Sequence, residues 1–283
     1  MYELTYQPLP DVDAYLARMN YTGSREVCLQ TLNDLIYTHQ CNVPFENLDC
    51  CDYHIPVSLE IDHLFEKVVL KRRGGYCFEL NGIFMALLRA LGFDAWSVMC
   101  RVAATFTELR PIKHRGIVVR LDGKLYYCDV GLGGPMAPFA VALDGTRQTV
   151  RGETYWIEEL QEEGWYILRR LSGAGLADDG LTTGVERNVV VFSRQAFMAE
   201  DFEAYSYQCW AFPDSRFVTR RNVNIRTADG YINLINDELT VCKNRVLTTT
   251  KVAPEDLDNL LRETYGLVND LGHYSIAPVG CQG

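Results

Sequence analysis

A cysteine between a glycine pair and an amphipathic helix is the residue of this sequence best suited to chemistry. Cys77 lies in the stretch KRRGGYCFELNG (residues 71–82), at the predicted start of the helix with the most regular apolar spacing in the chain. Unsatisfied backbone N–H groups and the helix dipole favour an anion there, so we expect a lowered thiol pKa. For such a thiol taken alone, a buried structural cysteine is the commoner alternative.

A predicted hairpin over residues 114–131 could hold the partners that a nucleophilic thiol needs, a base and a group that orients it. Its Asp-Gly pair at residues 122–123 is typical of a two-residue turn, which makes Leu121 face Lys124. A slip of one residue in this register would move every later side chain to the opposite face.

His114 and Asp129 are the candidate base and orienting group. In this register they lie on the same face of the hairpin, one diagonal step apart, which is roughly 7–8 Å between Cα atoms. Taken singly, His114 is as readily a solvated loop histidine and Asp129 a strand-end carboxylate. A Cys-His-Asp arrangement therefore depends on the hairpin turn.

A glycine-rich stretch, GLGGPMAP (residues 131–138), follows the aspartate. Such a turn after a strand can present N–H groups to a phosphate. It matches neither GxGxxG nor a P-loop, so a plain loop is the alternative.

The elements that must position these residues change character along the chain. Apolar residues keep helical spacing over residues 24–40, 58–70 and 77–91, with Ser24 and Ser58 as expected N-caps. From residue 95 the period becomes two, which predicts an antiparallel sheet or small barrel. The last third is mixed, with a helix expected within 193–210, strands at 217–227, 231–237 and 238–244, and a final helix opened by Pro254.

Composition excludes several classes of protein. The 283 residues are 48% hydrophobic with a net charge of −10, so a nucleic-acid partner is not expected. No apolar run approaches the roughly 18 residues of a membrane span, and the N-terminus does not resemble a secretory signal, so we expect a cytoplasmic protein without a membrane partner. The ten cysteines should stay reduced. The cluster of Cys41, Cys50, Cys51 and His54 lacks the spacing of a zinc site, so no metal is expected.

Four of these motifs together resemble the arylamine N-acetyltransferases. They are RGGYCFELN (73–81), VPFENLD (43–49), His114 and DVGLGGPMAP (129–138), with nucleophile, histidine and aspartate in the same order as in that family. DSRFVTRR (214–221) is similar to a segment of the family's third domain. The resemblance covers most of the chain and is weakest over the last third.

The resemblance implies an α+β fold with a cysteine-protease-like catalytic core. Its three parts would be an N-terminal helical bundle at 1–94, a central antiparallel β-barrel at 95–193 and a C-terminal α/β lid at 194–283. It also implies ping-pong acetyl transfer from acetyl-CoA, the co-substrate, to an arylamine or arylhydrazine. Cys77 would become acetylated, His114 would share its proton and Asp129 would hold the imidazole tautomer. The partners would be these small molecules alone, and the protein a monomer or homodimer.

Other positions carry over from the family one by one. Arg73 and Glu46 resemble a structural ion pair behind the cysteine loop, and Phe45 resembles a wall of the acceptor pocket. Gly131 and Gly133 resemble the turn beside the CoA pyrophosphate.

Arginines near residue 220 are cofactor candidates by residue type, because arginine suits phosphate geometry. Arg216, Arg220 and Arg221 are these candidates, with a solvated strand edge as the alternative.

Two departures from the family pattern bear on the substrates. Leu132 stands where the family has an aromatic residue, so stacking on an arylamine is weakened and the acceptor need not be a flat aromatic amine. The stretch EDFEAYSYQCW (200–210) lacks the asparagine expected after its Asp-Phe pair.

Three other functions remain as alternatives. An amide synthase or acyltransferase with a longer acyl donor would share the same triad, and a thiol hydrolase would use water as the second nucleophile. A binding module with an unused site would lack the enhanced alkylation rate of an activated thiol.

Overall fold

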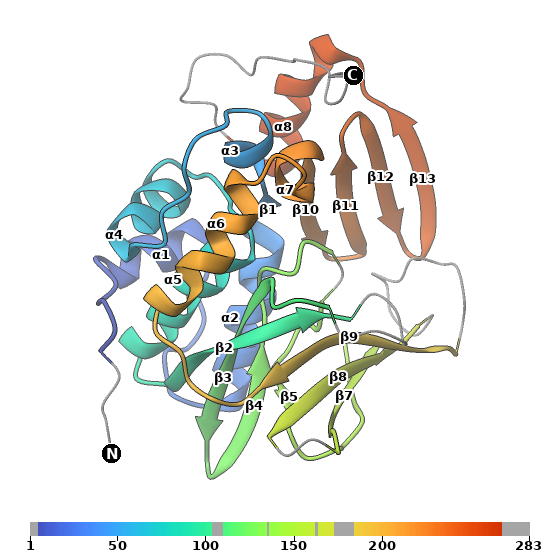
Figure 1. The fold of residues 1–283 in the computed structure, drawn as a ribbon. Coiled ribbons are helices and arrows are strands. Elements are labelled where there is room, and N and C mark those ends of the chain that lie inside the picture. Colours follow the sequence, from blue (N-terminus) through green and yellow to red (C-terminus); the bar gives the residue numbers. More distant parts are fainter. Residues whose placement is uncertain (1–4, 104–109, 135, 162–163, 173–183, 268–283) are drawn as a thin grey trace.

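The structure, a computed structural model, describes residues 5–103, 110–134, 136–161, 164–172 and 184–267. Helices gather at the N-terminal side, an eight-stranded sheet lies below them, and a five-stranded sheet stands beside them (Figure 1). This is the α+β arrangement expected from the sequence. The division into three domains at residues 94/95 and 193/194 stays a prediction.

The helical part holds the predicted helices, two of which begin later than expected. Ser24 and Ser58 do not cap them, because α2 begins only at Leu29 and α4 only at Ile61. Outside the helices, each hydroxyl accepts the backbone N–H two residues on, at 3.1 Å from Glu26 and 3.2 Å from Glu60. The helices of this part are α1 (Val12–Arg18), α2 (Leu29–Asn42), α3 (Leu48–Cys51), α4 (Ile61–Leu64), the π-helical η1 (Phe65–Leu70) and α5 (Cys77–Ala90).

Helix α5 is the buried centre of the molecule. Residues Cys77 to Leu88 are all buried, so this helix packs on all sides and not along one stripe. It ends as predicted at Gly92, whose φ of +96° stops the helix without steric strain. Because α5 contacts both β2 and β3, its first residue lies close to the sheet.

The eight-stranded sheet is antiparallel throughout and nearly closes into a barrel. Its order is β5-β4-β3-β2-β9-β8-β7-β6, and β5 also contacts β7. The strands are β2 (Asp94–Val102), β3 (His114–Leu121), β4 (Lys124–Cys128), β5 (Val141–Ala142), β6 (Gln148–Val150), β7 (Glu153–Glu159), β8 (Trp165–Leu171) and β9 (Glu186–Ser193).

The β3–β4 hairpin has the predicted register. Leu121 pairs with Lys124, and the ladder continues to Ile117 opposite Cys128. Asp122 and Gly123 have φ values of +50° and +76°, as the two central residues of a type I′ turn require.

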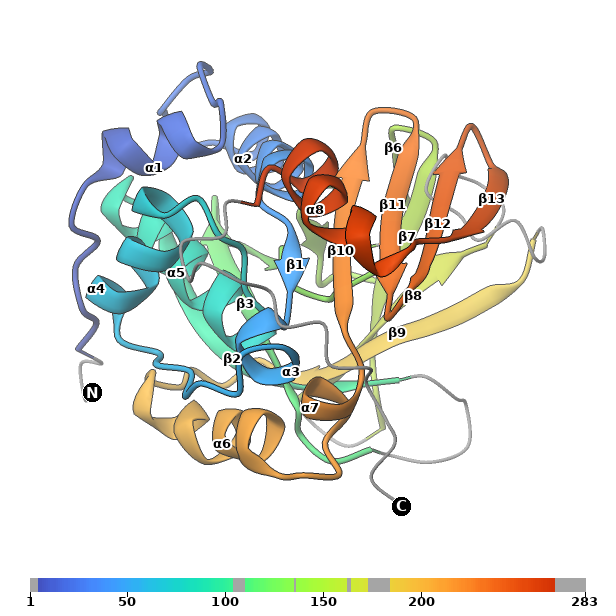
Figure 2. The same cartoon turned by 90° about the horizontal axis from the view of Figure 1, so that it is seen from above.

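The five-stranded sheet combines one strand from the helical part with four strands from the C-terminal third. Its first strand, β1 (Phe45–Glu46), comes from the helical part and pairs with β10 (Asn222–Thr227). In the view from above, this sheet stands beside α2 with α8 over one end (Figure 2). The other elements are β11 (Gly230–Ile235), β12 (Glu238–Lys243), β13 (Val246–Lys251), η2 (Glu200–Phe202), α6 (Glu203–Ala211), α7 (Arg216–Thr219), η3 (Pro254–Asp256) and α8 (Leu257–Tyr265).

The prediction of one strand over residues 217–227 was wrong. The Ser215 hydroxyl accepts the Phe217 N–H at 3.2 Å and begins the short helix α7, so β10 starts only at Asn222. Within the described ranges, no helix combines the length and the apolar character needed to cross a membrane.

Candidate active site

Cys77 is the first residue of α5, as predicted. The preceding Tyr76 is the N-cap, and the Glu79 side chain accepts the Tyr76 N–H at 2.9 Å, as the third residue of a helix does in a capping box. The side chain is buried, and its sulfur lies 3.7 Å from the carbonyl oxygen of Lys113, the residue before His114. The helix start therefore brings the thiol to the first residues of β3.

His114 and Asp129 are joined by a short hydrogen bond. His114 opens β3, Asp129 directly follows β4, and 2.5 Å separate His114 Nε2 from Asp129 Oδ2. Both side chains are almost completely buried. The hairpin register thus brings these two residues together. The other ring nitrogen of His114, Nδ1, does not take part in this hydrogen bond.

Three further donors surround the Asp129 carboxylate. Asn81 Nδ2 and the Gly131 N–H donate to Oδ1, and the Tyr127 hydroxyl donates to Oδ2, each at 2.9 Å. Burial alone would raise the pKa of Asp129. The His114 ring, Asn81 and the Gly131 N–H outweigh burial and lower this pKa below its usual value, so the carboxylate stays ionised at neutral pH.

Asn81 and Tyr127 were not singled out by sequence reasoning. Asn81 lies four residues after Cys77, on the same face of α5, and that spacing was the available signal. Its amide also donates to the Arg115 carbonyl at 2.6 Å and accepts the Val130 N–H at 2.9 Å, which ties the helix to both arms of the hairpin. Tyr127 carried no signal, because its role depends on the space that Gly116 leaves for its ring.

The environment of the thiol differs from the sequence-based expectation. Burial raises the pKa of the Cys77 thiol well above its usual value, and the charge of Asp129 acts in the same direction. The backbone N–H groups of Arg115 and Phe78 oppose this shift without cancelling it. The expected lowering of the pKa was wrong, because the helix start is buried and a lone thiolate there would be desolvated.

Arg73 and Glu46 form the expected ion pair. Arg73 Nε donates to Glu46 Oε1 at 3.0 Å, and both side chains are buried. Arg73 also binds Asp49 at 2.8 Å. This pair holds the segment that leads into Cys77.

Phe45 and Leu132 line one small cavity. This cavity has a volume of about 30 Å³, and Gly133 and side chains of β10 and β11 complete its lining. Gly133 has a φ of +74°, and an added Cβ would lie 2.8 Å from the Phe45 ring. Only glycine fits this close approach without strain.

Gly131 is used differently from the expectation. Its N–H is engaged by Asp129, and an added Cβ would lie 3.0 Å from the Cys77 Cα atom. This glycine therefore lets the hairpin and α5 approach one another, and its N–H is already bonded within the protein.

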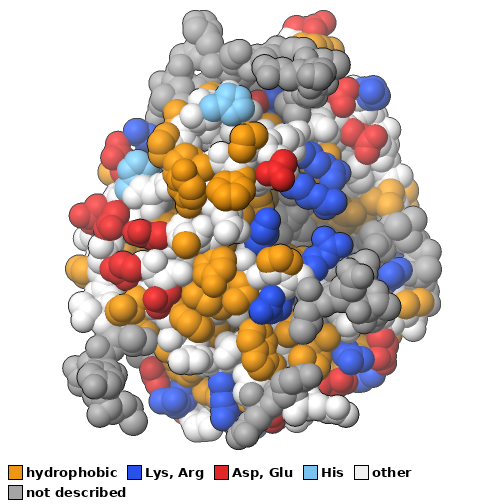
Figure 3. Space-filling model, in the orientation of Figure 1, with side chains coloured by type: hydrophobic (Ala, Val, Ile, Leu, Met, Phe, Trp, Pro, Cys, Tyr) orange, Lys and Arg blue, Asp and Glu red, His pale blue; other side chains and the backbone are white. Residues whose placement is uncertain are grey.

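The three candidate arginines lie in different surroundings. Arg216 is exposed and lines a cleft of about 530 Å³ together with Arg110, Lys113 and Phe217. Basic side chains gather on this face of the otherwise acidic protein (Figure 3). Arg220 is also exposed.

Arg221 is held inside the protein. It is buried, its Nε donates to Asp52 at 3.0 Å, and its Nη1 donates to the Asn236 carbonyl at 3.1 Å. Because these partners engage its guanidinium, we withdraw Arg221 as a phosphate ligand.

No three His, Cys, Asp or Glu side chains among the described residues come together to hold a metal ion. None of the nine cysteines in the described ranges forms a disulfide bond, and Cys281 lies outside those ranges.

Known proteins are similar to this chain in sequence and in fold. The model of an N-acetyltransferase family matches residues 28–272. An arylamine N-acetyltransferase of Mycobacterium tuberculosis is 31% identical over 274 residues, which cover 93% of this chain and 91% of that protein. An arylamine N-acetyltransferase of Escherichia coli is 39% identical over 155 residues, or 53% of this chain and 54% of that protein. Among solved structures, the arylamine N-acetyltransferase of Mycobacterium marinum in complex with CoA superposes with a TM-score of 0.80 at 26% identity, covering 91% of this chain and 93% of that one.

Proposed function

Because this chain belongs to the arylamine N-acetyltransferase family, we propose that it transfers an acetyl group from acetyl-CoA to an arylamine or arylhydrazine through an acetyl-cysteine intermediate. The observation that carries this proposal is the buried His114–Asp129 pair at 2.5 Å, together with a cysteine at the start of α5 whose sulfur lies 3.7 Å from the carbonyl oxygen of Lys113, the residue before His114. The CoA in the related M. marinum structure supports the choice of donor.

In the first half-reaction, His114 Nδ1 takes the proton of the Cys77 thiol. The thiolate attacks the thioester carbonyl carbon, and the tetrahedral adduct collapses with cleavage of the bond to the CoA sulfur. The imidazolium returns its proton to the departing CoA thiolate. Asp129 stays ionised throughout and keeps Nε2 as the donating nitrogen, so Nδ1 is free to accept.

In the second half-reaction, the amine attacks the carbonyl carbon of acetyl-Cys77. His114 Nδ1 removes a proton from the attacking nitrogen and delivers it to the cysteine sulfur as the C–S bond breaks. The amide leaves and the free thiol is restored.

The burial of Cys77 explains why the base must be adjacent. A lone thiolate is disfavoured in this environment, which is why burial raises the thiol pKa. Transfer of the proton to His114 creates an anion and a cation together, and their attraction offsets much of the desolvation cost.

The basic cleft beside α7 supports binding of the CoA phosphates. Arg110, Lys113 and Arg216 line it, and the Lys113 carbonyl lies at the Cys77 sulfur, so a phosphate-bearing donor held there reaches the nucleophile. Arg220, exposed at the end of α7, is the next candidate. Gly133 remains a proposed part of the turn beside the pyrophosphate.

Arg216→Met should raise the KM for acetyl-CoA by roughly tenfold or more, because one charge-assisted hydrogen bond to phosphate is worth about 1.5–3 kcal/mol. The KM for the acceptor should not change, and the effect should shrink at high salt. Arg25→Met is the control, since Arg25 forms an exposed ion pair with Asp13 in the helical part. An unchanged KM for acetyl-CoA would remove Arg216 from the site.

Leu132 bears on the choice of acceptor. With Leu132→Phe, the KM for 4-aminobenzoate should fall roughly two- to tenfold, because an aromatic pair adds about 0.5–1.5 kcal/mol beyond burial. The KM for an aliphatic amine should stay the same. Equal changes for both amines would show that residue 132 does not contact the acceptor ring.

The proposal is tested by intact mass after mixing the protein with acetyl-CoA and no acceptor. An acetyl-sized gain at Cys77, discharged by an aminobenzoate or an anisidine, is the expected result. A gain that only other amines discharge would change the acceptor class. Absence of any gain would point to a longer acyl donor or a thiol hydrolase. Cytoplasmic location and a monomeric or homodimeric state stay predictions.

A further inference from the structure

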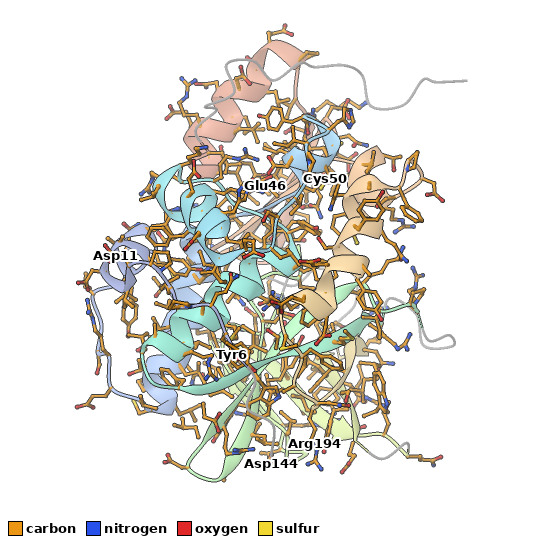
Figure 4. All side chains as sticks on the ribbon, turned by 60° about the vertical axis from the view of Figure 1, so that its left-hand side comes forward. Tyr6, Asp11, Glu46, Cys50, Asp144 and Arg194 are labelled. Carbon is orange, nitrogen blue, oxygen red and sulfur yellow. The ribbon has the colours of Figure 1, made fainter. Side chains whose placement is uncertain are left out.

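Five charged side chains form a buried charged network behind the cysteine loop. Glu46, Asp49, Lys67, Arg73 and Glu79 are each at most 7% exposed. Acids and bases alternate: Arg73 bridges Glu46 and Asp49, and Lys67 bridges Asp49 at 2.6 Å and Glu79 at 2.7 Å. Glu46 and Cys50, labelled in Figure 4, lie near one another in this region.

The two end members of this charged network hold one peptide unit, Glu46 through its backbone N–H and Glu79 through its side chain. The Gly75 carbonyl accepts the Glu46 N–H at 2.9 Å, and the Tyr76 N–H of the same peptide donates to Glu79 Oε2 at 2.9 Å. A Cβ at Gly75 would lie 2.8 Å from Glu79 Oε2, so the carboxylate lies directly against this backbone. The orientation of this peptide sets the direction in which α5 begins, one residue before Cys77.

No member of this charged network takes part in the proposed reaction steps, and Lys67 is the member that joins Asp49 to Glu79. It comes from the π-helical turn η1, an uncommon conformation often found at functional sites. Its ammonium donates to Glu79 Oε1 while Oε2 holds the Tyr76 N–H. Without Lys67, three carboxylates would share the single cation of Arg73 in a buried site, and at least one would take up a proton.

We propose that Lys67 is a positioning residue for the cysteine nucleophile: it holds Glu79 as a carboxylate against the Gly75–Tyr76 peptide and thereby fixes the first turn of α5. This inference rests on the proposed function, because Cys77 is taken to be the nucleophile. The residue acts through Glu79 and touches neither the substrate nor the sulfur.

The hold of Glu79 on the Tyr76 N–H depends on pH. Burial raises the pKa of Glu79 to about 7, although Lys67 lowers it. Glu79 is therefore mostly ionised only above about pH 7. Protonation below that value weakens its hold on the Tyr76 N–H. The other groups that act on Glu79 are Glu46 and Asp49, which raise its pKa, while Arg73, Cys50 and Tyr76 belong to the same charge environment.

The raised pKa of Glu79 also determines whether its contribution to folding stability rises or falls with pH. Between about pH 4.5 and 7, folded Glu79 holds a proton that the unfolded chain has released, so its contribution to stability falls as pH rises through this window. Glu79→Gln removes this dependence.

The test compares wild type, Lys67→Met, Glu79→Gln and the double variant between pH 5.5 and 9. Two rates are measured, acetylation of Cys77 by acetyl-CoA without acceptor and alkylation by iodoacetamide. Lys67→Met should slow both on the order of 10- to 100-fold at pH 7 and move their acid midpoint upward, because Glu79 loses its cation. Glu79→Gln should remove that midpoint with a smaller loss, since an amide oxygen still accepts the Tyr76 N–H.

The double variant should recover most of the loss of Lys67→Met, because the uncompensated carboxylate is gone. Lys71→Met, on an exposed ion pair with Glu66, is the matched control and should behave as wild type. A uniform loss without a shifted midpoint, or a double variant no faster than Lys67→Met, would overturn the inference. If wild type is alkylated but never acetylated, the proposed function fails while the alkylation series still tests Lys67. If Lys67→Met does not fold, Glu79→Gln alone decides, by whether the acid midpoint disappears.

Discussion

Cys77→Ala should bind acetyl-CoA and show no measurable acetyl transfer. The proposed route forms a covalent bond to the sulfur in its first step, and an alanine methyl group cannot form it. Loss of the nucleophile of a triad removes rate enhancements of about 10⁶ in well-studied hydrolases, so the remaining turnover should lie below ordinary detection. The assay is release of CoA and of acetylated arylamine, with intact mass to show that no acetyl group is gained.

A matched cysteine separates this effect from general damage. Cys242 is also buried, but it lies in β12 of the five-stranded sheet, so Cys242→Ala should keep most of the activity. Near-native turnover in Cys77→Ala would exclude the covalent route and would leave only direct transfer from CoA to the amine.

Asp129→Asn should leave a folded protein whose turnover is lower by about three to four powers of ten. In Ser-His-Asp triads the same exchange costs about 10⁴ in kcat, because the wrong imidazole tautomer is stabilised. Here the amide would also meet the Asn81, Gly131 and Tyr127 donors, all aimed at carboxylate oxygens. One of these donors would lose its acceptor, at a cost of about 1–3 kcal/mol in the free energy of unfolding.

The measurements are kcat for the complete reaction, the rate of Cys77 acetylation and the thermal unfolding midpoint. Both rates should fall while the KM for acetyl-CoA changes little, because Asp129 is not among the residues that line the donor cleft. A native acetylation rate in a folded Asp129→Asn protein would show that His114 keeps its tautomer without the carboxylate.

Much of the candidate site followed from the sequence because it depends on local rules. The start of α5 was readable from its apolar spacing, so Cys77 could be placed at a helix N-terminus. The Asp-Gly turn determined the register of β3 and β4, and the register put His114 and Asp129 on one face. The change of period from helix to strand similarly indicated the α+β fold.

Local rules failed where a nearby polar group competed with the regular pattern. Ser24 and Ser58 lie before the helices, which begin at Leu29 and Ile61, and their hydroxyls bond within the preceding turns. Ser215 begins a short helix within a stretch that alternates like a strand, which places Arg216 in α7 and Arg220 at its C-cap. The same kind of side-chain hydrogen bond thus occurs in a turn at two serines and in a helix cap at the third, and periodicity alone does not separate these cases.

Sequence patterns were sufficient to place each candidate residue on its own element: the nucleophile at a helix start and the base and carboxylate on one hairpin. The surroundings of these residues depend on how distant segments pack together. Three such contacts join residues far apart in the sequence: the pairing of β1 with β10, the ion pair of Arg221 with Asp52, and the charged network from Glu46 to Glu79. The pKa of Cys77 belongs to this second group, because desolvation depends on everything packed around the sulfur, and no stretch of sequence contains that information.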